Sequence, residues 1–460
     1  MNSGLSRRRF IQSVAATAGA AYLMPAASWG RVRGANDRLV FGLIGQGGQG
    51  SWHRQSLVGR AKQDNVTVKR VCDVYRRRLN KAISEIGGDS TSGTMDYREV
   101  LDDKDINCVL IATPDHWHTK IAIEAMEAGK DVYCEKPLSL TVEQAIECRN
   151  AVHRTKKLLQ VGPQGTSEPG TWAAREAIGA GRIGKVNWSQ AAYCRNSTEG
   201  QFNWHIDPDA GPNNDPKADG YVDWDMWLGT KWNLAPKIPW NADRFFRFRK
   251  YWDYNGGVAT DLMYHKLAPL LIAITGANGE YPKRVTAAGG QYIEKDGRDI
   301  ADQFFLMIDY PSEHTIVLAS VMTNDVGLDT VIHGQYGTME FGGGSAKELP
   351  GDEIRMKEQG TWWKKFREAN ADQIKTTMVK NDKGEERADP APGSALAKIK
   401  GAPRRDHVGN FFDAIRTGAP LDCNIDLGAS TMVAIKMGVE AYRTNKVLTW
   451  DAKAEKVIPG

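Results

Sequence analysis

The amino-acid sequence predicts an α/β protein with two unlike parts: a doubly wound parallel sheet, followed by an α/β domain with an open, largely antiparallel sheet. Two observations predict this arrangement. From Arg38 to Gln160, short apolar runs alternate with helical stretches, which is typical of parallel strands joined by helices. After Pro163, several β-like segments follow one another, which favours antiparallel pairing. We therefore expect the first domain at residues 37–162 and the second at residues 163–460.

The strands of the first domain are continuous apolar runs, because helices cover both faces of a parallel sheet. The first of them ends in a glycine-rich turn. Strands are expected at residues 38–44, 66–73, 106–112, 131–134 and 158–162. Helices are expected between them at residues 75–86, 119–129 and 141–155.

Alternating apolar and polar residues mark strands in the second domain. Strands are expected at residues 185–194, 284–293, 302–310 and 314–322, with helices at 256–274, 407–418 and 428–444. A loop rich in Asp, Pro, Gly and Trp spans about 196–250. Residues 343–402 are polar and rich in Lys and Glu. We interpret them as an insertion that forms an elaborated loop or an interface arm.

Composition excludes several classes of protein. Apolar and charged fractions are ordinary for a globular chain, so neither disorder nor a fibre is indicated. The formal net charge is only +4 over 460 residues, and no basic stripe lies beyond the N-terminus, so nucleic-acid binding is not expected.

The first thirty residues are typical of an export signal. Ser6–Gln12, SRRRFIQ, resembles the twin-arginine motif, and the apolar run from Val14 to Ala27 is too short to span a bilayer. The small residues Ala26, Ala27 and Ser28 provide a cleavage site. An uncleaved N-terminal anchor is the alternative. We expect a periplasmic protein with no stable membrane insertion after export. Because this pathway carries folded proteins out of a reducing cytoplasm, the six scattered cysteines are expected to stay reduced.

The clearest motif is the G-x-G-x-x-G formed by Gly45, Gly47 and Gly50, with Gly48 between them, placed after an apolar strand and before a helix. The first glycine permits a tight turn, the second lets the backbone approach a pyrophosphate, and the third lets the helix pack on the strand. The phosphates then lie at a helix N-terminus. The motif predicts a Rossmann domain that binds a dinucleotide; a glycine-rich turn without a ligand is the alternative.

Asp73 ends the next strand, about twenty residues after the last glycine. A carboxylate there is expected to bind the adenosine ribose hydroxyls and to repel a 2′-phosphate, which favours NAD as the cofactor. Arg76, Arg77 and Arg78 follow closely and are suited to hold that phosphate, so NADP is the alternative.

The stretch ATPDHWHTK, residues 112–120, ends another strand of the same sheet. Ligands bind at the carboxyl ends of such strands, so Thr113, Pro114 and His118 are expected to line the cofactor cleft. The two histidines diverge unless they lie in a loop, and no third ligand can be placed, so no metal site is predicted. For His116 a surface position at a helix N-terminus is favoured.

Lys136 follows the strand at residues 131–134, and is therefore expected at the same edge, on the nicotinamide side. Pro137 holds Glu135 and Lys136 in an extended conformation and keeps the lysine out of the following helix. A surface lysine before a helix is the alternative.

Asp261 and His265 are four residues apart in an expected helix, which places them on one face. A carboxylate beside an imidazole fixes its tautomer and raises its basicity, an arrangement suited to a general base. A polar pair buried for packing is the alternative.

In this order, these motifs resemble the Gfo/Idh/MocA family of NAD(P)-dependent oxidoreductases over most of residues 38–450. The most specific marks are Glu135-Lys136-Pro137 and the Asp261…His265 pair; residues 223–229 and 251–257 look like exported members. The resemblance implies that Lys136, Asp261 and His265 form the catalytic group. It also implies that the cofactor is held by Gly45, Gly47, Gly48, Gly50, Asp73, Thr113, Pro114, His118, Glu135 and Gln164. Thr166 stands where many members carry arginine, which leaves substrate contacts there open.

The activity implied is oxidation of a CH–OH group in a sugar, polyol or glycoside. His265, oriented by Asp261, takes the hydroxyl proton while hydride passes to the nicotinamide, and Lys136 stabilises the oxygen. The tryptophans 224, 227, 232, 240 and 252 suit stacking on sugar faces or core packing. The resemblance also implies a homo-oligomer, which we expect to be a dimer or tetramer.

Export sharpens this expectation, because free NAD is not supplied outside the cytoplasm. The cofactor is expected to be bound before export, to stay bound and to be reset in place, a plan similar to that of glucose–fructose oxidoreductase. One alternative is an NAD-dependent glycoside hydrolase that works by transient oxidation, elimination and re-reduction. Another is a non-catalytic exported sugar-binding protein of the same fold. The Glu-Lys-Pro signature favours oxidoreduction.

Overall fold

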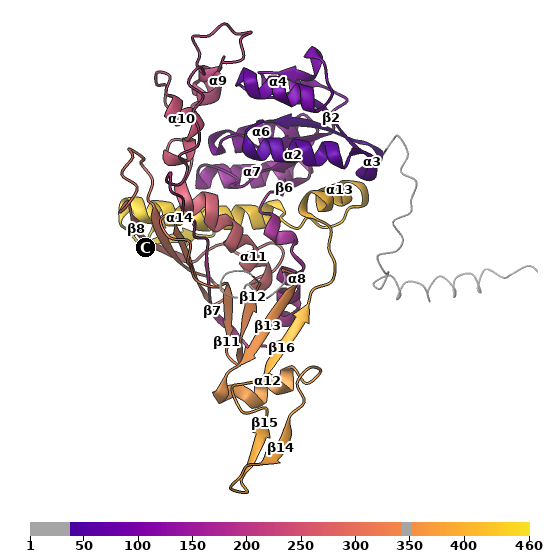
Figure 1. Ribbon diagram of the computed structural model, residues 1–460, viewed down its shortest axis with the longest axis vertical. Helices are drawn as coiled ribbons and strands as arrows, with labels where there is room; N and C mark the ends of the chain where they lie inside the picture. The colour runs from indigo at the N-terminus through magenta and orange to yellow at the C-terminus, as the bar shows by residue number, and fades with distance from the viewer. Residues whose placement is uncertain (1–36, 343–350) are drawn as a thin grey trace, which may run out of the picture. The chain divides into compact units, whose positions relative to one another are not determined.

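The computed structural model describes residues 37–342 and 351–460. The expected export signal and its cleavage site lie outside these described residues, as does part of the expected insertion. Leu39–Gly460 form one unit that contains both large sheets (Figure 1). Across the two described ranges, every helix is too short or too polar to cross a membrane.

The N-terminal domain is a six-stranded parallel sheet in the order β3-β2-β1-β4-β5-β6. Its strands are β1 (Leu39–Ile44), β2 (Val66–Cys72), β3 (Gly93–Thr94), β4 (Cys108–Ile111), β5 (Asp131–Cys134) and β6 (Leu159–Val161). Because β1 pairs with both β2 and β4, the strand order reverses at β1. A crevice for a ligand opens at the carboxyl ends of the strands at such a point. The predicted doubly wound sheet is confirmed.

Helices cover this sheet: α2 (Gly48–Gly59), α3 (Ala61–Asp64), α4 (Arg76–Glu85), α5 (Tyr97–Asp102), α6 (Asp115–Glu127) and α7 (Val142–Thr155). Helix α6 begins four residues earlier than expected and contains both histidines of HWH. The predicted surface position of His116 is wrong. Its side chain is buried, and its Nε2 lies 2.9 Å from the Trp227 carbonyl oxygen, because a segment more than a hundred residues later in the chain covers it.

The second domain contains a ten-stranded sheet in the order β16-β13-β12-β11-β7-β10-β9-β8-β17-β18. Its strands are β7 (Val186–Ala192), β8 (Arg284–Gly290), β9 (Gln303–Asp309), β10 (Thr315–Val321), β11 (Val331–Gly334), β12 (Gly337–Phe341), β13 (Glu353–Glu358), β16 (Leu396–Lys400), β17 (Leu448–Asp451) and β18 (Lys456–Pro459). Strands β7 and β10 pair in parallel, and the other neighbours pair antiparallel. The predicted open, largely antiparallel sheet is confirmed.

The expected insertion is more regular than a loop. Strands β13 and β16 extend the edge of the large sheet, while α12 (Trp363–Ala369) and the hairpin β14 (Thr377–Lys380) and β15 (Glu386–Asp389) lie beyond that edge (Figure 1). In β13, Ile354 and Met356 are buried and their neighbours are half-buried. The polar average over residues 343–402 conceals this alternation, so the prediction of an elaborated loop is wrong for β13 and β16.

The remaining elements of the second domain are mostly helical. They are η3 (Gln164–Ser167), α8 (Pro169–Gly179), α9 (Trp224–Leu228), η4 (Thr230–Trp232), α10 (Ala242–Phe246), η5 (Phe248–Lys250), the π-helical turn η6 (Ala259–Met263), α11 (Tyr264–Ile274), η7 (Gly360–Trp362), α13 (His407–Thr417) and α14 (Ile425–Thr444). The short η2 (Ser90–Ser92) belongs to the first domain. Helix α13 packs back on the parallel sheet, where Phe411 and Phe412 contact the ring of Phe41 edge-on.

All six cysteines carry free thiols. Cys194 is partly exposed, and the other five are buried. Burial raises the pKa of the buried thiols Cys72, Cys108, Cys134, Cys148 and Cys423, so these side chains behave as small apolar groups.

Candidate active site

A cavity of about 630 Å³ opens at the carboxyl edge of the parallel sheet, a size suited to a small-molecule or cofactor site. Every predicted site residue except Gly50 lines it: Gly45, Gly47, Gly48, Asp73, Thr113, Pro114, His118, Glu135, Lys136, Gln164, Asp261 and His265. The cavity therefore joins residues from both domains. The individual roles of these residues stay predictions.

The glycine-rich turn fits a pyrophosphate. Gly45 has a φ of +89°, and a Cβ there would lie 2.6 Å from the backbone of Ala112. A Cβ at Gly50 would lie 1.9 Å from the carbonyl oxygen of Gly45, so a glycine at position 50 lets helix α2 pack closely against the turn. At Gly48, the first residue of α2, a Cβ would meet none of the described atoms within 4 Å. Open space at the helix N-terminus leaves its backbone N–H groups accessible to an anion.

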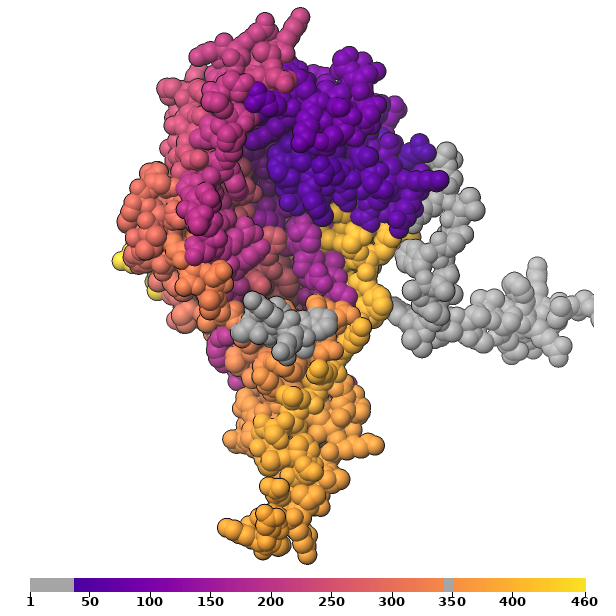
Figure 2. Space-filling model, viewed as in Figure 1, coloured from indigo at the N-terminus to yellow at the C-terminus, as the bar shows by residue number. Residues whose placement is uncertain are grey.

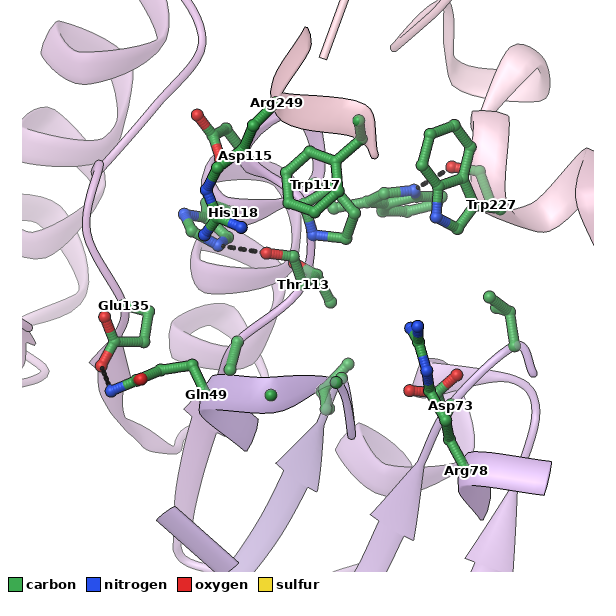
Figure 3. A pocket seen from close by; sticks show the side chains of 18 of the residues that line it. Gln49, Asp73, Arg78, Thr113, Asp115, Trp117, His118, Glu135, Trp227 and Arg249 are labelled. Atoms are coloured by element: carbon green, nitrogen blue, oxygen red, sulfur yellow. Dashed lines mark hydrogen bonds between the residues drawn. The ribbon is translucent and has the colours of Figure 1, made fainter. Parts of the chain in front are cut away.

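Asp73, which follows β2, is hydrogen-bonded to this turn. Its two carboxylate oxygens accept hydrogen bonds from the backbone N–H groups of Gln46, at 2.6 Å, and Tyr75, at 2.8 Å. Burial nevertheless raises the pKa of this carboxyl. Figure 3 shows Asp73 beside Arg78, opposite Glu135 and Gln49 across the site.

The three arginines after Asp73 do not act together. Arg77 pairs with Asp209, and the Nε of Arg76 donates to the carbonyl of Pro216. Arg78 lines the cavity and lies over the rings of Phe245 and Phe246. The carboxylate with one neighbouring arginine fits NAD.

Lys136 and Asp261 form an ion pair in the wall of the cavity. The Nζ of Lys136 lies 2.8 Å from both the backbone carbonyl oxygen and the Oδ1 of Asp261. The Nε of Arg249 donates to the same Oδ1 at 2.9 Å. Although burial disfavours ionisation, the charges of Arg249 and Lys136 hold the pKa of Asp261 well below its usual range. Two of the three N–H donors of Lys136 are thus used, and one remains for a ligand.

The expected hydrogen bond between His265 and Asp261 does not form. Among the hydrogen bonds of the described residues, none joins it to Asp261. Asp261 belongs to the π-helical turn η6, whose turn is wider than that of an α-helix, and its carboxylate interacts electrostatically with His265. Burial and the charge of Lys136 lower the pKa of His265 to about 3. The charge of Asp261 does raise the pKa of His265, as predicted, but burial and the charge of Lys136 outweigh that effect.

Glu135 accepts more hydrogen bonds than sequence reasoning foresaw. Its Oε1 lies 2.6 Å from the Nε2 of His53, and also accepts from the amides of Gln49, at 3.1 Å, and Gln164, at 3.2 Å. Its Oε2 accepts from the backbone N–H of Lys136 at 3.2 Å. Burial opposes ionisation, but the hydrogen bonds and charges of His53, Lys136 and Gln49 together outweigh it, and the pKa of Glu135 falls to about 2.

Asp115, the first residue of α6, is a further carboxyl in the cavity wall that the sequence did not single out. Its Oδ2 accepts a hydrogen bond from the Nδ2 of Asn255 at 2.6 Å. Burial raises the pKa of Asp115 to about 7. Figure 3 shows it beside Arg249.

Most of the tryptophans proposed for sugar stacking pack in the interior instead. Trp224 and Trp240 belong to an aromatic cluster with Phe245, and Trp232 and Trp252 pack against the main core. Of the five, Trp227 lines the cavity, and two unpredicted tryptophans, Trp117 and Trp204, line it as well. Thr166 is buried and its Oγ1 donates to the carbonyl of Pro163, so it takes no part in the cavity wall. Within the described ranges, His, Cys, Asp and Glu side chains form no group of three suited to a metal ion.

Two parts of the chain match sequence families. Residues 39–163 match the Gfo/Idh/MocA description "Oxidoreductase family, NAD-binding Rossmann fold", and residues 184–325 match "Oxidoreductase family, C-terminal alpha/beta domain". Among curated proteins, a glycosyl hydrolase family 109 protein of Shewanella baltica OS195 is 34% identical over 128 residues, which cover 26% of this chain and 27% of that protein. A protein of the same description from Shewanella sp. W3-18-1 is 33% identical with the same coverage. The match thus spans about a quarter of these relatives.

Solved structures resemble the chain over most of its length. Levoglucosan dehydrogenase in complex with NADH has a TM-score of 0.60 at 21% identity, covering 89% of this chain and 98% of that one. An aldose-aldose oxidoreductase from Caulobacter crescentus, complexed with glycerol, has a TM-score of 0.60 at 15% identity, covering 90% and 99%. At these identities the likeness shows a shared fold.

Proposed function

The chain belongs to the Gfo/Idh/MocA oxidoreductase family, and we propose that it is an NAD-dependent enzyme that oxidises a CH–OH group of a sugar, polyol or glycoside. The observation that carries the proposal is the ion pair of Lys136 and Asp261, which lies in the same cavity as the glycine cradle. The NADH complex of levoglucosan dehydrogenase, a similarly folded protein, supports the substrate class.

When bound, the cofactor supplies a hydride acceptor at the nicotinamide. Lys136 directs its remaining N–H to the substrate oxygen and stabilises the negative charge that develops there. Asp261 holds the lysine in place, and Arg249 keeps that carboxylate ionised. His265 lines the same cavity, and we assign to it the acceptance of the hydroxyl proton.

A clamp over the adenosine end supports a retained cofactor. In this clamp, residues 207–222, Val222 forms a β-bridge with Tyr75, and Asp209 pairs with Arg77 at 2.5 Å. The hydroxyl of Tyr75 also donates to Asp207 at 2.7 Å. Figure 2 shows the magenta and pink chain that includes this clamp beside the indigo and purple N-terminal domain. Since the clamp contacts the segment directly after Asp73, we propose that it slows release of the cofactor, as a periplasmic enzyme with an in-place redox cycle requires.

The direct test is to purify the protein, denature it, and record the absorbance and mass of what is released. Near-stoichiometric NAD(H) is the expected result. Protein that emerges empty and binds NADH only weakly contradicts cofactor retention. Protein that emerges empty and does not bind NADH at all contradicts the proposed NAD-dependent activity.

A second candidate function is NAD-dependent glycoside cleavage by transient oxidation, elimination and re-reduction. It is supported by the glycosyl hydrolase family 109 relatives, although the match covers about a quarter of their length. A panel of free sugars and glycosides, read both for cofactor reduction and for bond cleavage, separates the two. Reduction of the bound cofactor by a free sugar without bond cleavage favours oxidoreduction, whereas release of sugar from a glycoside without net NADH favours hydrolysis.

A further inference from the structure

We propose that His53 is a positioning residue that fixes Glu135 as an ionised hydrogen-bond acceptor for the bound cofactor, an inference that rests on the proposed NAD-dependent function. His53 is fully buried in α2. Its Nε2 lies 2.6 Å from the Oε1 of Glu135, the shortest contact of that carboxylate. The two residues are 82 positions apart.

The geometry defines the direction of this hydrogen bond. An ionised carboxylate only accepts, so the Nε2 of His53 carries the hydrogen of this contact. The Nδ1 of the same ring is buried and has no hydrogen-bond partner among the described residues. The Oε1 of Glu135 is held by this donor from α2.

The contact links the cofactor-binding helix to the catalytic turn. His53 and Gln49 both lie on α2, whose N-terminus carries the glycine cradle, and both donate to Oε1 of Glu135. Gln164, at the start of the second domain, completes the set. Oε1 is crowded by three donors, whereas Oε2 accepts only the backbone N–H of Lys136 and keeps a lone-pair site for a further donor. A cofactor hydroxyl or amide is the group that suits it.

Other charged or titratable groups also face Glu135. Tyr133, Cys134 and Lys136 belong to its own strand and turn, and His118, His265 and His407 approach from α6, α11 and α13. Burial lowers the pKa of the three histidines and raises that of the phenol and the thiol. The wild-type pH profile provides the baseline for all of them.

The test measures NADH affinity by fluorescence titration between about pH 5 and about pH 9, the range in which a perturbed carboxyl titrates. In His53→Leu, Glu135 loses its main partner while burial remains, so its pKa rises. Affinity should then fall by about tenfold per pH unit on the acid side of the new pKa, with a much flatter wild-type profile. His53→Gln supplies an amide donor and should restore much of the flat profile. Glu135→Gln cannot ionise and should bind NADH more weakly, with no such acid step.

His314→Leu is the matched control, since His314 is a buried histidine stacked on Tyr310 in the second domain. It should lower the melting temperature without adding a pH dependence. A His53→Leu protein that melts earlier but keeps the wild-type affinity profile overturns the inference and leaves the proposed function intact. If His53→Leu fails to fold, the same decision rests on His53→Gln and Glu135→Gln: unaltered affinity in Glu135→Gln overturns it. Wild-type protein that carries no NAD(H) as purified and does not bind added NADH overturns both proposals.

Discussion

The Nζ of Lys136 lies 2.8 Å from the Oδ1 of Asp261, although the two residues are 125 positions apart in the chain. Lys136 follows a strand of the parallel sheet, and Asp261 lies in a π-helical turn of the second domain. Their ion pair therefore joins the two domains at the end of the cavity where we place the chemistry. It also leaves one lysine donor for a substrate oxygen.

Lys136→Ala should abolish turnover and leave NADH binding nearly intact. The variant loses the donor that stabilises the developing charge, and loss of one such group costs about 10²- to 10³-fold in rate. Turnover with the best sugar of the panel and NADH affinity by fluorescence should be compared. Lys185→Ala, which removes an exposed lysine paired with Glu313, is the control. Wild-type-like activity in Lys136→Ala would remove Lys136 from the mechanism.

Asp115→Asn should stabilise the protein at neutral and alkaline pH. The folded-state pKa of Asp115, about 7, lies above the ordinary carboxyl value because the group is buried. A raised carboxyl pKa contributes stability that is present below the unfolded value of about 4 and is lost as pH rises to about 7. Asparagine is never charged and can still accept from Asn255.

The comparison of melting temperatures at about pH 4 and about pH 8 checks this prediction. The gain over wild type should be largest at the higher pH and disappear at the lower one. Asp105→Asn, at an exposed carboxylate paired with Lys69, should show no such gain. A lower melting temperature for Asp115→Asn at the higher pH would mean that the charge of Asp115 stabilises the fold.

Local patterns predicted much of the fold and of the cavity wall. The glycine turn, Asp73 and Lys136 each follow a strand of one sheet, and the topology of a parallel sheet brings such residues to one edge. Contacts between distant segments were not encoded in any local pattern. His53 reaches Glu135, and Arg249 reaches Asp261, only because separate elements converge.

Periodicity also failed where helix geometry departs from the α form. The pattern over residues 256–274 predicted one regular helix, but η6 is a π-helical turn, and no propensity distinguishes it in the sequence. The burial of His116 under Trp227 likewise depends on the fold of a long loop. In β13, a short alternation was hidden by its polar surroundings.

Detaching the clamp should speed cofactor release. The double variant Asp207→Ala/Asp209→Ala removes the partners of Tyr75 and Arg77. Because exposed ion pairs contribute at most about 1 kcal/mol each, release of NADH should accelerate by several-fold rather than by orders of magnitude. Release is followed by NADH fluorescence after mixing loaded protein with excess NAD. Asp215→Ala, in the same segment but bonded to the backbone of Lys217, should release at the wild-type rate; equal rates for all three proteins would contradict the clamp.

The outer face of the ten-stranded sheet should be the interface of a homo-oligomer. Trp188, Phe305 and Met307 are 39%, 43% and 52% exposed on β7 and β9, and such an apolar patch is characteristic of an interaction surface. Met307→Lys places a charge in its middle and should convert a dimer or tetramer into smaller species, as measured by light scattering after gel filtration. Met378→Lys, on the separate hairpin β14–β15 and also exposed, should keep the wild-type mass. A mass change in Met378→Lys alone would move the interface to the hairpin, and a monomeric wild-type protein would contradict the assembly altogether.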